Sequence, residues 1–265
     1  MIAYQRQSRG FSLVELMISL AIGLIVVSAV LAFTLSSLTA NSEYVQSTRL
    51  SQELRNSMDF VSRELRRAGY DENMNRYTAA STLNALTISP FSYIYVEDDA
   101  DGDGAANDGC VIYAYDRTGG APGTVELARG EIRALRLAFR TVDGQTMGVL
   151  EIAESATGLT PACNGGAPTY TNYPATCNTA SGWCALTDPR VINITGFTLD
   201  TSGYIEQAVT ATSTALTIRE IGIGLDGQLR QSADGTVTRG ISSRVKVRAD
   251  CLRARADCAQ RPTGT

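Results

Sequence analysis

The acidic segment, residues 97–109, offers oxygen ligands at alternate positions, which is the spacing that suits a hard cation. Asp99, Asp101 and Asp103 occupy the places of ligands 1, 3 and 5 of a calcium-binding loop. Gly104 follows at position 6, where such loops turn sharply. The spacing therefore predicts a candidate calcium site with weak, extracellular-type affinity.

The match to a calcium loop is partial over the rest of the segment. Asn107 falls at position 9, but Cys110 stands at position 12, where a bidentate glutamate is expected. Asp108 or a backbone carbonyl could complete the shell in its place. The alternative is a solvated acidic hairpin turn between strands at 93–96 and 111–115, because Asp-Gly pairs favour such turns.

Glu15 is the next residue whose chemistry needs an explanation, because it stands at the start of a long apolar run. Residues 16–38 carry no charge, and a carboxylate costs about 2.5–3.5 kcal/mol at a bilayer centre and less near its surface. As a helix this run is about 34 Å long, enough to span a membrane. Arg6 and Arg9 precede it, and basic flanks stay cytoplasmic, so the rest of the chain is predicted to be exported.

The sequence GFSLVELMISLAIGLIVVSAVLA around Glu15 resembles the N-terminus of the type IV pilin superfamily. Gly10, Phe11 and Glu15 stand where its members have the last leader residue, a methylated phenylalanine and a glutamate. The resemblance implies cleavage between Gly10 and Phe11 by the prepilin peptidase, followed by N-methylation of Phe11. The new α-amino group can pair with Glu15 of a neighbouring subunit, because two charges that are costly in an apolar core become tolerable together.

Two alternatives exist for this N-terminus. Glu15 could be an interfacial glutamate that the dipole of a helix N-terminus stabilises. The other alternative is ordinary signal-peptide cleavage near residues 39–42, although the apolar run exceeds the usual 7–15 residues.

Three further stretches narrow the resemblance to one group of pilins. SRELRRAGY at residues 62–70, and LTIREIGIGLDGQLR and SSRVKVRAD within residues 216–250, are similar to PilW-type minor pilins, the large J-like subunits. This resemblance implies a minor pilin that primes type IV pilus assembly and is incorporated at or near the pilus tip. The alternative is a J-type minor pseudopilin of type II secretion, whose members tend to be shorter and to lack a cysteine-rich loop.

The same resemblance implies the partners and the location of the protein. The partners would be other minor pilins, the major pilin, the prepilin peptidase, the inner-membrane assembly platform and the lipid bilayer. The protein would lie in the inner membrane with a periplasmic domain before assembly, and in the pilus at the cell surface afterwards.

Composition excludes several functions. The chain has no histidine, which removes imidazole-based catalysis and most zinc chemistry. A net charge of −4 without a basic run gives no footprint for nucleic acid. The sequence contains no GxSxG motif, P-loop or paired nucleophile and base, so it predicts a protein that is not an enzyme.

Six cysteines form an even set in a domain predicted to be exported, which indicates up to three disulfides in an oxidising compartment. The resemblance to pilins implies a bridge between Cys251 and Cys258 that closes a short C-terminal loop. The pairing of the other four stays open: Cys110, Cys163, Cys177 and Cys184. Three of these four lie in the cysteine-rich loop, residues 156–189, which is predicted to be stapled.

One long helix must carry the N-terminal motif. No proline interrupts residues 11–69, and Gly69 is a plausible stop. Beyond the apolar run a periodic stripe predicts an amphipathic helix with one buried face: Val45, Leu50, Leu54, Met58, Val61, Leu65 and Ala68. Arg63, Arg66 and Arg67 predict either a solvated helix face or a contact with a neighbouring subunit.

Short apolar or alternating runs follow the helix and predict a sheet. The expected strands are at 83–89, 91–96, 111–115, 132–141, 148–153, 191–199, 215–225 and 243–249. The run RALRLAF within 132–141 is also compatible with a helix. The predicted fold class is α+β, a spine helix packed on antiparallel sheet. The predicted organisation is a leader at 1–10, a transmembrane half of the helix at 11–40 and a globular domain at 41–265.

Overall fold

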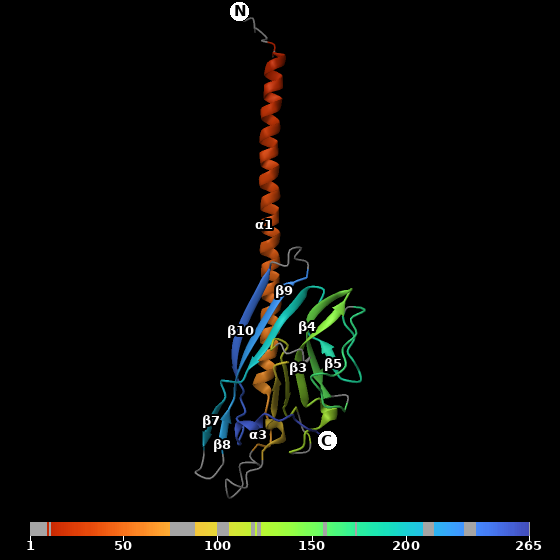
Figure 1. Cartoon of the computed structure of the whole chain (residues 1–265), viewed down its shortest axis with the longest axis vertical. Coiled ribbons are helices and arrows are strands. Elements are labelled where there is room, and N and C mark those ends of the chain that lie inside the picture. Colours follow the sequence, from red (N-terminus) through yellow and green to blue (C-terminus); the bar gives the residue numbers. More distant parts are fainter. Residues whose placement is uncertain are drawn as a thin grey trace, which may run out of the picture. The chain divides into compact units, whose positions relative to one another are not determined.

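The structure is a computed structural model that describes residues 10, 12–74, 88–99, 106–117, 120, 123–155, 158–172, 174–208, 215–230 and 237–264 (Figure 1). The chain divides into two compact units, Met1–Thr48 and Arg49–Thr265. One helix, α1 (Leu13–Arg67), forms the described part of the first unit almost entirely and continues into the second.

The helix α1 is uninterrupted for 55 residues, as the absence of proline predicts. Its ends suit the helix dipole, because Glu15 lies in the first turn and Arg66 and Arg67 lie in the last. It stops before Gly69, whose φ of 78° is the left-handed conformation that glycine adopts at helix C-termini. The amide of Gly69 donates to the carbonyl of Ala114, 2.8 Å away, so the stop is tied to the sheet.

From Arg49 onward α1 buries one face, which confirms most of the predicted stripe. The apolar side chains of this face are at most 6% exposed: Leu50, Leu54, Met58, Val61, Leu65 and Ala68. Val45, the first residue of the predicted stripe, is exposed instead and belongs to the first unit. The buried face also carries a charged residue, Glu64, which is 4% exposed.

The larger sheet has five antiparallel strands in the order β1-β2-β3-β4-β5, so each strand pairs with the next along the chain. A tight turn at Asp143 and Gly144, both with positive φ, joins its two longest strands. The strands are β1 (Ile94–Glu97), β2 (Cys110–Ala114), β3 (Ile132–Val142), β4 (Gln145–Glu154) and β5 (Trp183–Ala185).

Both faces of this sheet are buried, because successive side chains of a strand point to opposite faces. The face that shares a core with the α1 stripe includes Val111, Tyr113, Leu135, Leu137 and Leu150. The opposite face clusters with Cys163 and Trp183 of the cysteine-rich loop and includes Cys110, Ile112, Ala114, Ile132 and Ala134. The sheet therefore lies between the spine helix and the cysteine-rich loop.

A second antiparallel sheet, in the order β10-β9-β6, contributes to the same core as α1. Figure 1 shows β9 and β10 side by side in blue. Its strands are β6 (Ile192–Asp200), β9 (Glu220–Leu229) and β10 (Thr238–Lys246).

A further antiparallel pair consists of β7 (Ile205–Ala208) and β8 (Ala215–Ile218). Three short helical turns complete the described elements: η2 (Pro90–Ser92), η3 (Leu127–Arg129) and α3 (Arg255–Cys258). The α+β prediction is confirmed.

The predicted strands differ from the observed ones in a few places. The strand expected at 83–89 falls outside the described residues except for its last two, which are not in a strand. The strand expected at 91–96 begins only at Ile94, because residues 90–92 form η2. The single strand expected at 215–225 is two strands, β8 and β9, that belong to different sheets and are separated by Arg219. The short strands β5 and β7 were not predicted.

All six cysteines are bridged. Cys110 pairs with Cys163, which fastens the cysteine-rich loop to β2. The bridge between Cys177 and Cys184 closes a turn within that loop. The third bridge joins the pair expected from the resemblance, Cys251 and Cys258.

Candidate functional site

The N-terminal motif lies at the edge of the described structure. Gly10 is exposed, and Phe11 lies outside the described residues. Glu15 is exposed in the first turn of α1, and its carbonyl accepts a hydrogen bond from the Ser19 hydroxyl at 2.5 Å. This position near a helix N-terminus favours an anion. The pairing of Glu15 with another subunit stays a prediction.

The apolar half of α1 exposes its side chains on every face. In the first unit the large hydrophobic residues between Leu13 and Leu38 are each at least 55% exposed. Within the described part of the chain, α1 is the helix that is long and apolar enough to cross a membrane. Such a continuous apolar surface marks a contact with lipid or with other proteins.

The acidic segment is described only at its two ends. Asp101 and Asp103 lie outside the described residues, whereas Asp99 and Asp108 face each other in an isolated bridge. Asp108 is 1% exposed, so this end of the segment is not a solvated turn. The described residues contain no group of three or more histidine, cysteine, aspartate or glutamate side chains that could hold a metal. Calcium binding stays a prediction.

The C-terminal end of the acidic segment is tied to the second sheet. The Asn107 carbonyl accepts from the amide of Phe197 at 2.6 Å, and the Gly109 amide donates to the Phe197 carbonyl at 2.7 Å. The flanking strands β1 and β2 pair antiparallel, with Glu97 opposite Cys110. The segment therefore joins two antiparallel strands, and its described C-terminal end is buried against the second sheet, unlike the solvated turn of the alternative prediction.

The structure contains a buried charge network between α1 and the larger sheet that was not predicted. The Glu64 carboxylate accepts hydrogen bonds from Arg133 Nη1 at 3.1 Å and from the Tyr113 hydroxyl at 3.0 Å. Arg133 also pairs with Glu154 at 2.6 Å, and Arg67 reaches Glu64 at 3.3 Å. Charges can be buried here because each has a partner of opposite sign.

The network shifts the pKa values of its members. Burial, and then the Glu64 carboxylate, raise the pKa of Tyr113 well above its ordinary value, so the hydroxyl stays protonated and donates. Burial lowers the pKa of Arg133, but Tyr115 and the carboxylates of Glu64 and Glu154 outweigh it, and the pKa is raised. Arg133 therefore keeps its charge and holds α1 against the sheet.

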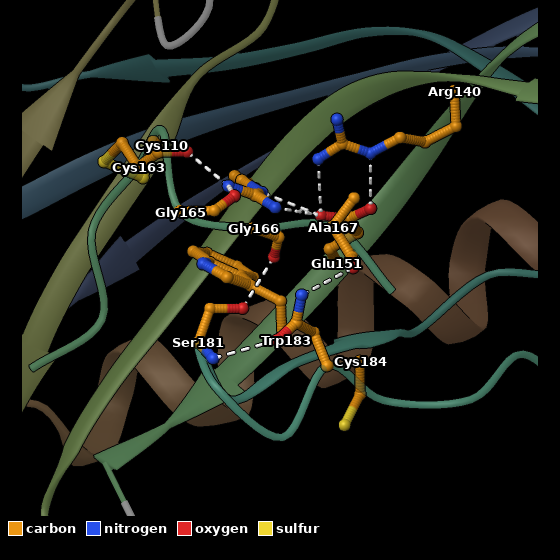
Figure 2. Close-up of polar contacts among 12 residues, drawn as sticks. Cys110, Arg140, Glu151, Cys163, Gly165, Gly166, Ala167, Ser181, Trp183 and Cys184 are labelled. Carbon is orange, nitrogen blue, oxygen red and sulfur yellow. Dashed lines mark hydrogen bonds and ion pairs between the residues drawn. A yellow bond between two sulfur atoms is a disulfide. The ribbon is translucent and has the colours of Figure 1, made fainter. Parts of the chain in front are cut away.

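A second buried network lies on the opposite face of β3. Arg136 and Glu151 are at most 2% exposed, and Arg136 Nε donates to Glu151 at 2.7 Å. Glu151 also accepts from Arg140 Nε at 2.9 Å and from the Tyr170 hydroxyl at 2.7 Å. Figure 2 shows the two hydrogen bonds that join Arg140 to Glu151. The guanidinium of Arg136 lies 3.9 Å from the centre of the Trp183 ring, a cation–π contact.

This second network holds the cysteine-rich loop. Arg136 Nη1 donates to the carbonyls of Cys163 at 2.5 Å and Gly165 at 2.9 Å. Burial lowers the pKa of Arg136, although Glu151 opposes the shift. The Trp183 indole N–H donates to the carbonyl of Ala162 at 3.1 Å. The tryptophan is buried beneath the loop and is therefore not accessible to a ligand.

The chemistry of both networks is structural. Glu64 binds Arg133, 69 residues away, and Arg136 binds the carbonyl of Cys163, 27 residues away, so each network joins segments that are distant in sequence. Removing one member of such a group leaves a buried charge without its partner, which is strongly destabilising.

Comparison with known proteins agrees with the N-terminal motif and the fold. The family model described as prepilin peptidase-dependent protein B matches residues 43–247, and the one described as the prokaryotic N-terminal methylation motif matches residues 5–31. The first match covers more than half of the chain, and the second includes Gly10, Phe11 and Glu15. Neither a curated protein nor a solved structure gives a significant match.

Proposed function

The chain belongs to the prepilin peptidase-dependent protein B family, and from this membership we propose that it is a minor pilin that primes type IV pilus assembly. As a prepilin-processed, pilin-like protein it belongs to a class of structural proteins rather than enzymes. The proposal is that it acts from the inner membrane and is then incorporated at or near the pilus tip. The observation that carries it is an apolar helix segment, exposed on every face, that begins within the residues matched by the methylation motif.

The proposed mechanism begins with processing. Prepilin peptidase cuts between Gly10 and Phe11, which leaves the apolar half of α1 in the mature protein and creates an α-amino group at Phe11. In the assembled filament this amine and Glu15 of a neighbouring subunit form a pair in an apolar surrounding. Each charge alone would be expensive there, so the pair fixes the register of one subunit against the next.

N-terminal mass spectrometry of the membrane-extracted protein tests the processing step. The mature chain should begin at Phe11 and carry an N-methyl group. A chain that begins at Met1, or near Asn41 after ordinary signal cleavage, would contradict the proposal.

Substitution of Glu15 tests the assembly step. Glu15→Ala should leave the protein inserted and folded, because it removes a charge from the edge of an apolar segment. Pilus number on the native host should fall, because the neighbouring amine loses its partner. Glu43→Ala is the matched control, since it removes the same charge from the exposed part of the same helix. Equal pilus numbers in both variants would refute the pairing.

A J-type minor pseudopilin of type II secretion is the competing function, because it would use the same motif and the same helix. The disulfide-stapled loop favours the pilus, since J-type pseudopilins tend to lack it. Deletion of the gene separates the two: loss of surface pili with normal export of secreted enzymes supports the minor pilin. The reverse result supports the pseudopilin.

The proposed partners follow from this assignment. They are other minor pilins, the major pilin, the prepilin peptidase, the assembly platform and the bilayer. The proposed location is the inner membrane with a periplasmic domain, where an oxidising environment preserves the three disulfides, and then the pilus at the cell surface.

A further inference from the structure

A cavity of about 700 Å³ lies in the second unit, where α1 ends; we refer to it as the end cavity. Its lining includes five arginines from four parts of the chain: Arg66, Arg67, Arg117, Arg133 and Arg248. Such a convergence is unusual, because like charges repel unless other groups hold them in place. The volume is in the range of cavities that bind small organic molecules.

The floor of the end cavity is rigid. Arg133, which is 7% exposed, is fixed by Glu64 at 3.1 Å and by Glu154 at 2.6 Å. Its guanidinium lies 5.5 Å from the centre of the Tyr115 ring. A guanidinium that is held from two sides loses little conformational freedom when a ligand arrives, which is the condition for a preorganised site.

The exposed rim of the end cavity carries guanidinium groups with unused hydrogen-bond donors. Arg66 and Arg248 are exposed, and neither side chain makes a hydrogen bond or an ion pair with any of the residues that the structure describes. Arg67 and Arg117 each make a single ion pair, at 3.3 and 3.4 Å, and a guanidinium carries five donors. Donors on this rim are therefore available to an anion.

The charge of the lining limits which anion fits. Asp71, Asp116 and Asp250 also line the end cavity, and Glu64 and Glu154 balance the charge of Arg133. The surplus of positive charge is therefore small and favours a singly charged group over a phosphate dianion. Asp71 is already occupied, because it accepts from the Ser89 hydroxyl at 2.6 Å. Tyr70, 55% exposed, adds an aromatic surface for the apolar part of a ligand.

We propose that the end cavity is a carboxylate-binding site in which Arg66 and Arg248 bind the carboxylate of an organic ligand. Guanidinium groups match a planar carboxylate with paired hydrogen bonds, which makes arginine the side chain best suited to this recognition. The carboxylate can belong to a free organic acid or to the C-terminus of a polypeptide. This proposal does not depend on the role in pilus assembly.

Ligand-observed NMR on the full-length chain in detergent tests the site with four probes at equal ionic strength. The probes are butyrate, acetyl-trialanine, the C-terminal amide of acetyl-trialanine, and inorganic phosphate. Butyrate binding alone identifies a free acid as the ligand type. Binding of acetyl-trialanine without binding of its amide identifies a polypeptide terminus. Either result supports the site, because the peptide and its amide differ only in the carboxylate.

Variants locate the binding. The double substitution Arg66→Ala/Arg248→Ala should raise the dissociation constant at least about tenfold, because two charge-assisted contacts are lost. Arg55→Ala/Arg244→Ala is the matched control, since it removes the same charge from exposed arginines outside the end cavity. The proposal is overturned if neither carboxylate binds, if the amide or phosphate binds as tightly, or if the control double variant loses as much affinity. The comparison of acid and amide needs no variant and stands even if a substitution impairs folding.

Discussion

Glu64→Gln should destabilise the domain far more than a surface substitution on the same helix. The carboxylate is 4% exposed and binds Arg133 and the fully buried hydroxyl of Tyr113. Breaking a buried pair from one side costs about 3–5 kcal/mol. Because Arg133 keeps its 2.6 Å contact with Glu154, and the amide oxygen still accepts from Tyr113, we expect a cost below that range, about 2–3 kcal/mol.

The control is Arg67→Ala, which removes another partner of Glu64. The Arg67 side chain is 60% exposed and its contact is 3.3 Å long, so its loss should cost less than about 1 kcal/mol. Trp183, the only tryptophan and fully buried, reports thermal unfolding of the full-length chain by fluorescence. For a domain of this size we expect the unfolding temperature to fall by roughly 5–10 °C in Glu64→Gln and by less than about 4 °C in Arg67→Ala. Equal shifts in the two variants would refute the argument that burial makes this pair important.

In a double-mutant cycle, the loss of unfolding free energy in the double variant Glu64→Gln/Arg133→Gln should be smaller than the sum of the losses in the two single variants.

Replacing the Cys110–Cys163 bridge by serines should cost about 4 kcal/mol and replacing Cys251–Cys258 about 2.5 kcal/mol, because their sequence separations are 53 and 7. The two unfolding temperatures test that order, and a reversed order would contradict the loop-entropy argument. Stability should fall above about pH 10, because the pKa of Tyr113 is raised on folding: its contribution is complete below the ordinary value of 10.0 and is lost as the pH rises toward the folded value. Alkaline unfolding curves should be flatter for Tyr113→Phe, and identical curves would exclude this tyrosine as the cause. Millimolar calcium should raise the unfolding temperature, magnesium should raise it less, and a chelator should reverse the shift. If calcium, magnesium and the chelator all leave the unfolding curve unchanged, the acidic segment serves only as a connection between two strands.

The spine helix could be predicted closely from the sequence because its signals are local. A missing proline, a stripe at helical spacing and a glycine stop all act within a few residues of the backbone that they shape. The structure places the helix at Leu13–Arg67, within two residues of the expected ends. The buried positions on its second half follow from the same periodicity, from Leu50 to Leu65.

The strand β3 shows why part of the sheet was ambiguous. Its run from Ile132 to Phe139 is apolar except for Arg133 and Arg136, and alternation is hidden when both faces of a strand are buried. Leu135 and Leu137 pack toward the α1 core, while Ile132 and Ala134 pack toward the cysteine-rich loop. A local pattern cannot distinguish such a strand from a buried helix, and pairing with β2 and β4 decides it.

The buried charges could not be predicted, because their partners are distant in sequence. Glu64 and Arg133 are 69 residues apart, and residue types alone do not show which charges are enclosed. A weak signal existed on α1, since Glu64 lies three residues after Val61 and next to Leu65 on the face that the stripe predicts to be buried. An acid in that place requires a cation from another element. The arginine at position 133 of the facing strand supplies it.

At Gly69, after the end of α1, a local conformational preference and a contact with a residue distant in sequence act on the same position. The sequence predicts it as a stop because glycine adopts the left-handed conformation readily, and its φ of 78° agrees. The fold imposes a second requirement, since a Cβ at this position would lie 2.7 Å from the guanidinium of Arg219. Arg219 is fully buried and donates to the carbonyls of Ser92 and Ala249, and burial lowers its pKa to about 10, so it remains charged at neutral pH. The same residue interrupts the strand that was expected to run through it. One buried cation thus leaves no room for a side chain at the glycine that follows the helix, and it occupies the break between β8 and β9 where the sequence predicted a single strand.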